Sequence, residues 1–276
     1  MRFSLITTLL PLLALTADLT TATGPTKKQL ANRSKKFSIG IVLYPGFEPL
    51  DVIGPFEIMQ SLSAYYPMTI SFIASKTGPI SSRAPPHVMV PGQPPVDLSH
   101  LIAIDLYATH TFTTAPPLDI LLIPGGMGGM VLVENNDTSI EQFITSRYNQ
   151  LEYLLSVCTG SMSLARAGVL KRKRATTNKS FWPWVMQFGG KVKWVPTARW
   201  TQDGKIWTSS GVAAGMDMTY AFLSHVYGTE QLNSIMNAIE YAPHTDPSWD
   251  PFSVVWNVPG ANQGGPIESC VKPAGL

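Results

Sequence analysis

The sequence predicts a single doubly wound α/β domain. Short apolar runs alternate along the chain with longer stretches that suit helices, which is the order that builds a parallel sheet with helices on both faces. The first run, residues 37–43, is nearly all apolar, as a strand at the centre of a parallel sheet is. The run at residues 153–157 leads through a small polar cluster into a helix-compatible stretch, and Cys158 stands at the turn.

The expected strands are short apolar runs followed by turn formers. They are residues 37–43, 68–74, 118–123 and 153–157, a short strand at 174–178, and a hairpin with arms 194–198 and 205–209 around Asp203-Gly204. The expected helices lie between and after these runs. They are residues 50–59, 138–150, 161–167, 181–188, 211–227 and 230–240.

The N-terminus is typical of an export signal. Arg2 is followed by an apolar stretch and then by small residues, with cleavage expected after Ala17 or Ala22. We therefore divide the chain into a signal peptide at 1–22, a polar tether at 23–36, a domain at 37–245 and a coil tail at 246–276, with a surface insertion at about 84–105. The mature protein is expected to be secreted, with no membrane contact after cleavage.

The amino-acid composition limits the classes of molecule that the protein is expected to bind. Hydrophobic residues make up 45% of the chain and charged residues 14%, with a formal net charge of +2. Such a small net charge argues against nucleic acid as a partner. The one basic run, residues 171–174, is expected on a solvated loop at a helix end.

Export makes two further features relevant. Asn32, Asn136 and Asn178 each begin an Asn-X-Ser/Thr glycosylation sequon, and Asn136 is the best candidate. The two cysteines, Cys158 and Cys270, could form a disulfide in an oxidising compartment. A free Cys158 is favoured because Cys270 lies in a Gly- and Pro-rich tail.

Cys158 is the candidate nucleophile. A strand-to-helix turn lifts a side chain out of the sheet, and the helix start is expected to favour the reactive thiolate. The alternative is a cysteine that acts as a small core hydrophobe. Asp51 follows the first strand, at the sheet edge where ligands gather, although it also suits a helix N-cap. Gly125 and Gly126 begin a glycine loop whose backbone N–H groups suit close approach to a ligand.

Several segments together resemble the DJ-1/PfpI superfamily, and within it the isonitrile hydratase-like branch. They occur in the family's order over residues 37–245, and include residues 50–57, 118–126, 156–161, 164–170, 174–177, 211–217 and 240–243. The resemblance implies a flavodoxin-like doubly wound sheet with a cysteine nucleophile elbow. It also implies a homodimer.

Two positions depart from the wider superfamily. Thr159 stands where many members have a histidine after the cysteine, as it does in isonitrile hydratases. Asn178 and Lys179 stand where the family pattern has a histidine and then an aromatic residue. A Cys-His-Asp triad is therefore not expected.

The resemblance implies cofactor-free and metal-free hydration of an isonitrile, a small-molecule substrate, to an N-substituted formamide. Cys158 would attack the terminal carbon, Asp51 would supply a proton and then help to position or deprotonate water, and Thr159 would orient Asp51 or the intermediate. Backbone N–H groups around Gly125, Gly126 and Thr159 would stabilise negative charge. The alternatives are glyoxalase-type activity on glyoxal or methylglyoxal, or a non-catalytic redox-sensing or stress protein. Phe47, Trp182 and Trp184 could line the pocket, but aromatic residues at helical spacing are more often part of the core, so none is taken as a site residue.

Overall fold

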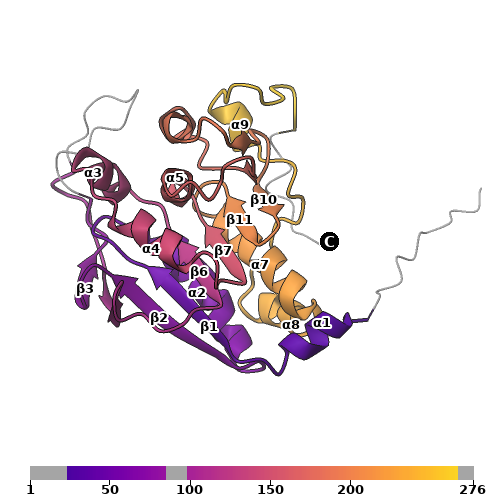
Figure 1. Cartoon of the computed structure of the whole chain (residues 1–276). Helices are drawn as coiled ribbons and strands as arrows, with labels where there is room; N and C mark the ends of the chain where they lie inside the picture. Colours follow the sequence, from indigo (N-terminus) through magenta and orange to yellow (C-terminus); the bar gives the residue numbers. More distant parts are fainter. Residues whose placement is uncertain (1–23, 85–97, 267–276) are drawn as a thin grey trace, which may run out of the picture.

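The computed structural model describes residues 24–84 and 98–266. The predicted signal peptide, Cys270 and most of the predicted insertion lie outside the described residues. At its centre is a seven-stranded sheet in which all neighbouring strands are parallel except the last pair (Figure 1). Its order is β5 (His110–Thr111), β2 (Met68–Ala74), β1 (Phe37–Val42), β6 (Ile120–Ile123), β7 (Tyr153–Ser156), β11 (Ile206–Ser209) and β10 (Trp200–Asp203). The predicted fold class is confirmed.

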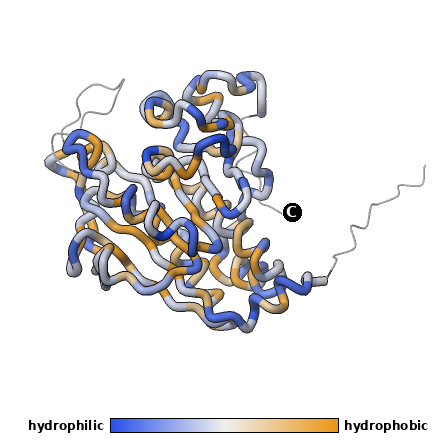
Figure 2. The backbone as a smooth tube through the Cα atoms, in the orientation of Figure 1, coloured by the Kyte–Doolittle hydropathy of each residue, from blue (hydrophilic) through white to orange (hydrophobic). Residues whose placement is uncertain are grey.

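Helices cover both faces of this sheet. One group packs together through contacts of α2 (Pro49–Ser63) with α7 (Ala214–Tyr227) and α8 (Glu230–Ala238). The other group comprises α3 (Gly128–Glu134), α4 (Ser139–Arg147) and α5 (Gly160–Arg166), and α5 rests on β6 and β7. The tube coloured by hydropathy shows apolar segments running through the middle of the molecule, where the buried strands lie (Figure 2).

Two small sheets flank the main one. β3 (Gly78–Ser81) pairs with β4 (Asp105–Ala108), and β8 (Arg174–Ala175) pairs with β9 (Lys193–Trp194). Between β8 and β9 lie α6 (Trp182–Val185) and a 3-10 turn, Met186–Phe188.

The hairpin is present, but its turn is Gly204-Lys205, one residue later than predicted, and its first arm differs. Asp203 pairs with Ile206, so the loop between the arms has only two residues, and Gly204 adopts a φ of +64° there. A two-residue loop requires the arm to end directly before it. The first arm is therefore β10, and residues 194–198 are too far from the turn to serve.

The predicted tether is partly a docked helix, α1 (Lys27–Asn32). Thr26 and Gln29 form a capping box that starts it, and the Asn32 side chain donates to the carbonyl of Val226 at 2.9 Å. The predicted coil tail also differs, since it contains α9 (Phe252–Val255) and a fully buried Asp250. Both ends of the described chain thus fold back onto the domain.

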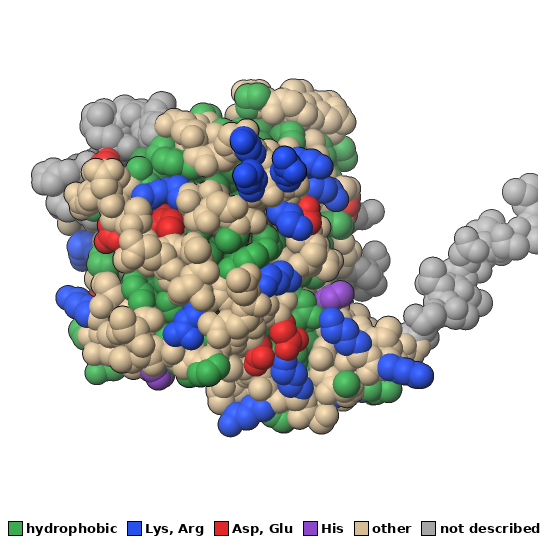
Figure 3. Space-filling view, viewed as in Figure 1, with side chains coloured by type: hydrophobic (Ala, Val, Ile, Leu, Met, Phe, Trp, Pro, Cys, Tyr) green, Lys and Arg blue, Asp and Glu red, His purple; other side chains and the backbone are tan. Residues whose placement is uncertain are grey.

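The surface carries mixed charge. On the face in Figure 3, Lys and Arg side chains are spread out with Asp and Glu among them. Among the described residues, none of the helices combines the length and the apolar character that crossing a bilayer requires.

Candidate functional site

The candidate site lies where the order of the sheet reverses. From β1 the chain passes to β2 on one side, whereas the later strands β6, β7 and β11 extend the sheet on the other. Crevices at such a switch point, beyond the carboxyl ends of the strands, are where open α/β sheets bind ligands. Three segments that follow β1, β6 and β7 meet here: the first turn of α2 carries Asp51, and the next two are loops that carry Gly125 and Cys158.

Cys158 occupies a strained strand-to-helix turn between β7 and α5. Its φ is +57°, a left-handed conformation that costs energy for any residue with a side chain. The turn is held from both sides, because the Cys158 N–H donates to Ser210 and its carbonyl accepts from the Thr177 hydroxyl, each at 3.0 Å. The fold therefore fixes the direction in which the thiol points.

Gly160 lets this turn pack against the loop after β6. A Cβ at this position would lie 2.8 Å from the carbonyl oxygen of Pro124 and closer still to that of Ile123. We expect Gly160→Ala to lower the free energy of unfolding by about 1–3 kcal/mol, because backbone must shift to admit the methyl group. Urea denaturation measures it, with Gly190→Ala, which meets no atom within 4 Å, as the control. Equal stability of the two variants would contradict this account of the turn.

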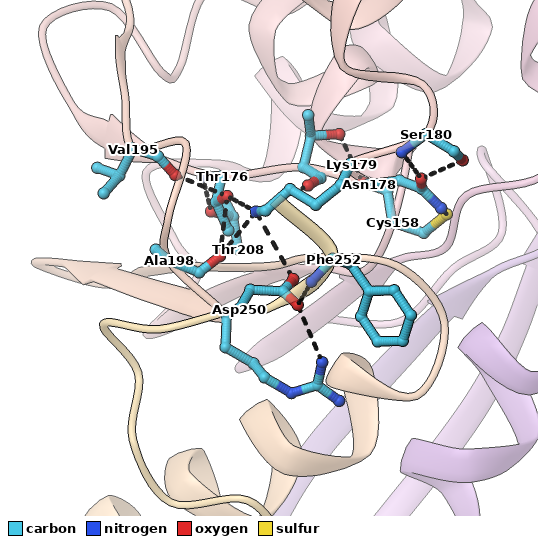
Figure 4. Close-up of polar contacts among 12 residues, drawn as sticks. Cys158, Thr176, Asn178, Lys179, Ser180, Val195, Ala198, Thr208, Asp250 and Phe252 are labelled. Atoms are coloured by element: carbon cyan, nitrogen blue, oxygen red, sulfur yellow. Dashed lines mark hydrogen bonds and ion pairs between the residues drawn. The ribbon is translucent and has the colours of Figure 1, made fainter. Parts of the chain in front are cut away.

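Three hydrogen-bond donors converge on the Cys158 sulfur. The Asn178 side-chain amide donates to it at 3.1 Å, and the backbone N–H groups of Thr159 and Val212 also hydrogen-bond to it. The amide of Asn178 is oriented by Ser180, whose N–H and hydroxyl both donate to Oδ1 (Figure 4). The residue that replaces the family's histidine thus faces the sulfur as a donor.

Burial and hydrogen bonding of the asparagine side chains indicate which of the three sequons could carry a glycan. The Asn178 side chain is buried and donates to the sulfur, and that of Asn32 is buried and donates to Val226. A glycan has to be carried on that same amide nitrogen, so neither position suits one in the folded protein. Asn136 is exposed, directly beyond α3, and remains the candidate that fits.

Asp51 lies in the first turn of α2 and is completely buried. Its Oδ2 accepts from the Gly125 N–H at 2.7 Å, and its carboxyl interacts electrostatically with the Cys158 side chain. Burial raises the pKa of Asp51 well above its usual range, and the nearby Glu48 carboxyl raises it further, against the hydrogen bond from Gly125 and the interaction with Cys158. These effects favour the protonated form of the carboxyl.

The thiol is likewise held in its protonated form. Burial raises the pKa of Cys158, the Asp51 carboxyl adds to the rise, and the three donors from Asn178, Thr159 and Val212 oppose it. The expectation that the helix start makes Cys158 a thiolate is wrong, because the effect of burial on the pKa of the thiol outweighs that of these donors. The Cys158 thiol and the Asp51 carboxyl instead interact as a pair of groups whose pKa values are both raised, so both favour their protonated forms.

Thr159 and the glycine loop hold the site together. The Gly125 N–H is used by Asp51, and the Gly126 N–H donates to the Thr159 hydroxyl at 3.1 Å. Thr159 is thus held in place by Gly126, and its role in orienting Asp51 or the intermediate stays a prediction. A Cβ on Gly125 would lie 2.6 Å from the Thr159 nitrogen, so only glycine allows this approach. Both amides are engaged within the protein, and the donors that face a reacting atom are those on the sulfur.

A cavity of about 130 Å³ opens onto the thiol. Its walls include the predicted residues Cys158, Thr159, Gly126 and Asn178. They also include residues that the sequence did not indicate: Glu48, Met127, Met130, Phe181 and Val212. Trp184, which was weighed as a pocket residue and then left in the core, is buried and lines the cavity. Within residues 24–84 and 98–266, no three His, Cys, Asp or Glu side chains are grouped to hold a metal ion.

These features define an α/β protein whose site is a cysteine elbow paired with a buried carboxyl at the switch point of a parallel sheet. The DJ-1/PfpI family model matches residues 37–225, and the chain belongs to the DJ-1/PfpI family.

Similar proteins agree with this assignment. An isonitrile hydratase from Pseudomonas putida is 30% identical over 206 residues, which cover 74% of this chain and 78% of that protein. The structure resembles a ThiJ/PfpI family protein from Pseudomonas syringae, with a TM-score of 0.62 and 26% identity over 86% of this chain and 88% of that one. It also shares its fold with DJ-1beta from Drosophila melanogaster, with a TM-score of 0.59 and 16% identity over 75% and 100% of the two chains.

Proposed function

We propose that the protein is a cysteine-dependent enzyme that hydrates isonitriles to N-substituted formamides. The observation that carries the proposal is the pairing of Cys158, which lines a small cavity, with the buried Asp51 carboxyl, whose pKa is raised. An isonitrile carbon needs both a nucleophile and a proton, and this pair supplies them. The 30% identity to an isonitrile hydratase supports the same reaction.

In the first step the Cys158 sulfur forms a bond to the terminal carbon of the isonitrile, and that carbon receives a proton from Asp51. The thiol proton passes to the Asp51 carboxylate as the sulfur attacks, so no net charge is left behind. The product is a thioimidate, R–N=CH–S–Cys158. The donors on the sulfur from Asn178, Thr159 and Val212 stabilise the negative charge that develops there before the carbon–sulfur bond is complete.

In the second step water adds to the thioimidate carbon, and the nitrogen gains a proton. The tetrahedral intermediate collapses by breaking the carbon–sulfur bond, which gives R–NH–CHO and returns the thiol. One water is consumed for each isonitrile and no oxidant is required. In this step Asp51 gives its proton to the imine nitrogen and takes one from the attacking water, and the hydroxyl proton of the intermediate passes to the departing sulfur.

The cavity indicates which substituents fit. Met127, Met130, Phe181 and Trp184 form an apolar wall, and about 130 Å³ admits a small group. Apolar side chains of this kind take up alkyl or aryl groups and offer no partner to a charged one. We propose that the substrates are small apolar isonitriles.

Glu48 supplies the route for protons. Because Asp51 is completely buried while Glu48 lines the cavity and interacts electrostatically with it, Glu48 can exchange protons between cavity water and Asp51. Burial also raises the pKa of Glu48, which brings it closer to neutral pH. We expect Glu48→Gln to lower kcat by about 10- to 100-fold, less than loss of Asp51 itself.

Steady-state formamide production measures this effect. Glu57→Gln, a change to an exposed carboxyl on the same helix, is the matched control and should leave kcat within about twofold, as surface substitutions do. A Glu48→Gln enzyme with the control's kcat would remove Glu48 from the mechanism.

The proposed function is tested by giving the reduced protein a small alkyl isonitrile and, separately, methylglyoxal. Proton NMR follows formamide in one sample and lactate in the other. Formamide alone is the expected result. Lactate alone would favour the glyoxalase-type reading, for which the Cys158–Asp51 pair also offers a nucleophile and a proton donor. Neither product, with Cys158 free and alkylatable, would leave the redox-sensing or stress role.

Export, a glycan at Asn136 and a homodimer also remain proposals. Expression in a secreting host, followed by intact mass measurement, checks cleavage near Ala22 and the modification of Asn136. A size-exclusion profile with light scattering reports the mass in solution. A monomer, or an unprocessed chain, would remove the corresponding proposal and leave the chemistry of Cys158 unaffected.

A further inference from the structure

The C-terminal segment at residues 246–258 reaches the back of the site, although it lies beyond the part of the chain that matches the family model. Asp250 in this segment is completely buried. Its Oδ1 lies 3.4 Å from Arg199 Nη1, and its Oδ2 lies 3.8 Å from Lys179 Nζ (Figure 4). The carbonyl of Pro247, also in this segment, accepts from the Arg199 N–H at 2.9 Å.

These contacts belong to a buried network of two cations and two carboxylates. Arg199 forms 2.7 Å contacts with Asp217 of α7 through Nε and Nη2, and Asp250 lies between Arg199 and Lys179. Lys179 is almost completely buried, and burial lowers its pKa to about 8 against the opposing charge of Asp250. Removing one member of such a network leaves a buried charge without its partner.

The network is connected to two of the donors on the sulfur. Lys179 directly follows Asn178, and its ammonium is tied to the Thr176 hydroxyl at 2.8 Å and to the Ala198 carbonyl at 2.7 Å. On the other side, the Arg199 carbonyl accepts from the Ser210 N–H at 2.8 Å. Ser210 in turn accepts from the Cys158 N–H and stands two residues before Val212.

Two cavities border the Asn178 side chain. A second cavity, of about 250 Å³, is bordered by Asn178, Lys179, Arg199 and Val212, and by Phe252 and Trp256 of the C-terminal segment. Asn178 therefore borders both cavities, and Gly211 packs against its amide. Its place at the sulfur depends on Ser180 and on the anchoring of its neighbour Lys179.

We propose that Asp250 is a positioning residue that holds the Asn178 and Val212 donors against the Cys158 sulfur through Lys179 and Arg199. The C-terminal segment is then part of the site, not a solvent-exposed tail. The inference rests on Cys158 being the nucleophile of the proposed function, but alkylation of the thiol tests it without any isonitrile. A protein that hydrates no isonitrile therefore still gives a result.

The sign of the effect separates positioning from simple electrostatics. Removing a buried carboxylate makes the region more positive, which by charge alone favours the thiolate and speeds alkylation. Loss of the donors favours the thiol and slows alkylation. Asp250→Asn should therefore slow the reaction if the residue positions the donors.

The experiment is the pH profile of iodoacetamide alkylation in the reduced full-length protein, with peptide mass spectrometry to follow Cys158 apart from Cys270. Asp250→Asn is expected to slow alkylation at pH 8 by about tenfold, equivalent to a thiol pKa raised by about one unit. Asp246→Asn, an exposed carboxyl of the same segment, is the matched control and should follow the wild type. In an Asn178→Ala background Asp250→Asn should slow alkylation by less than twofold, since the main donor that it holds is already gone.

Three outcomes would overturn the proposal: alkylation of Asp250→Asn at the wild-type rate, faster alkylation, or an equal slowing with and without Asn178. Near-ultraviolet circular dichroism verifies that each variant is folded. If Asp250→Asn does not fold, the pair Lys179→Met with Asp250→Asn removes one cation and one carboxylate together and leaves Arg199 paired with Asp217. That double variant is expected to show the same tenfold slowing, and a wild-type rate in it would refute the positioning role.

Discussion

Cys158→Ser is expected to lower isonitrile hydration by at least about 10³-fold, the largest effect of any single change. A serine hydroxyl has the same shape and meets the same three donors, but it is a far weaker acid than a thiol. The buried site, which already raises the pKa of the thiol, disfavours an alkoxide still more. Formamide production by NMR measures the loss.

A matched control is provided by the chain itself. Cys270 is the other cysteine in the sequence, and Cys270→Ser should keep wild-type turnover. Cys158→Ser should also keep the wild-type melting temperature within about 3 °C, because the substitution changes neither the shape of the side chain nor the turn. Hydration by Cys158→Ser at more than a hundredth of the wild-type rate would show that the sulfur is not the nucleophile.

Asp51→Asn is expected to have the second largest effect, a loss of about 10²- to 10⁴-fold in kcat, the range that one acid–base group contributes. An asparagine can still accept from the Gly125 N–H, so the loop keeps its place. It cannot deliver a proton to the isonitrile carbon. Alkylation of Cys158 should become faster in this variant, because the Asp51 carboxyl is one of the causes that raise the pKa of the thiol. Slower alkylation, or undiminished hydration, would contradict the pairing of the two groups.

The same variant should change how stability depends on pH. The pKa of Asp51 is raised in the folded protein, so its contribution to stability is present at pH values below about 3.8 and is lost as the pH rises toward the folded-state pKa. An asparagine at position 51 does not titrate, so its contribution to the free energy of unfolding does not change over this pH range. The melting temperature of Asp51→Asn relative to wild type should therefore increase between pH 4 and pH 8, as scanning calorimetry would show. A constant difference would mean that Asp51 is ionised in the folded state.

The fold and the elbow that carries Cys158 could be predicted from the sequence because both depend on local pattern. Apolar runs such as residues 118–123 mark buried parallel strands, and β6 lies within that run. The turn from β7 into α5 is marked by small residues around Cys158, and Asp51 follows the first strand at the edge where β1 ends. Alternation, turn chemistry and strand ends are all visible within about ten residues of chain.

The rest of the site depends on contacts between distant segments. In the sequence, Asn178 is the start of a glycosylation sequon and stands where the family resemblance implies a histidine. Only the folded chain shows that its amide donates to the Cys158 sulfur. Asp250 lies 71 residues after Lys179 in a segment that reads as coil, and no periodicity indicates that the two charges meet. The direction of the thiol pKa was also predicted wrongly, because a helix start is visible in sequence whereas complete burial is not.

The most direct test of cysteine-dependent hydration is turnover of a small alkyl isonitrile in water enriched in oxygen-18. The reduced wild-type protein is predicted to form formamide in excess of its own concentration, with one heavy oxygen in each product molecule. The oxygen enters from water as the thioimidate is cleaved, so Cys158 is regenerated and can react again. The contradicting result is no formamide from a protein in which iodoacetamide still modifies Cys158, since a free and reactive thiol would then lack the chemistry assigned to it.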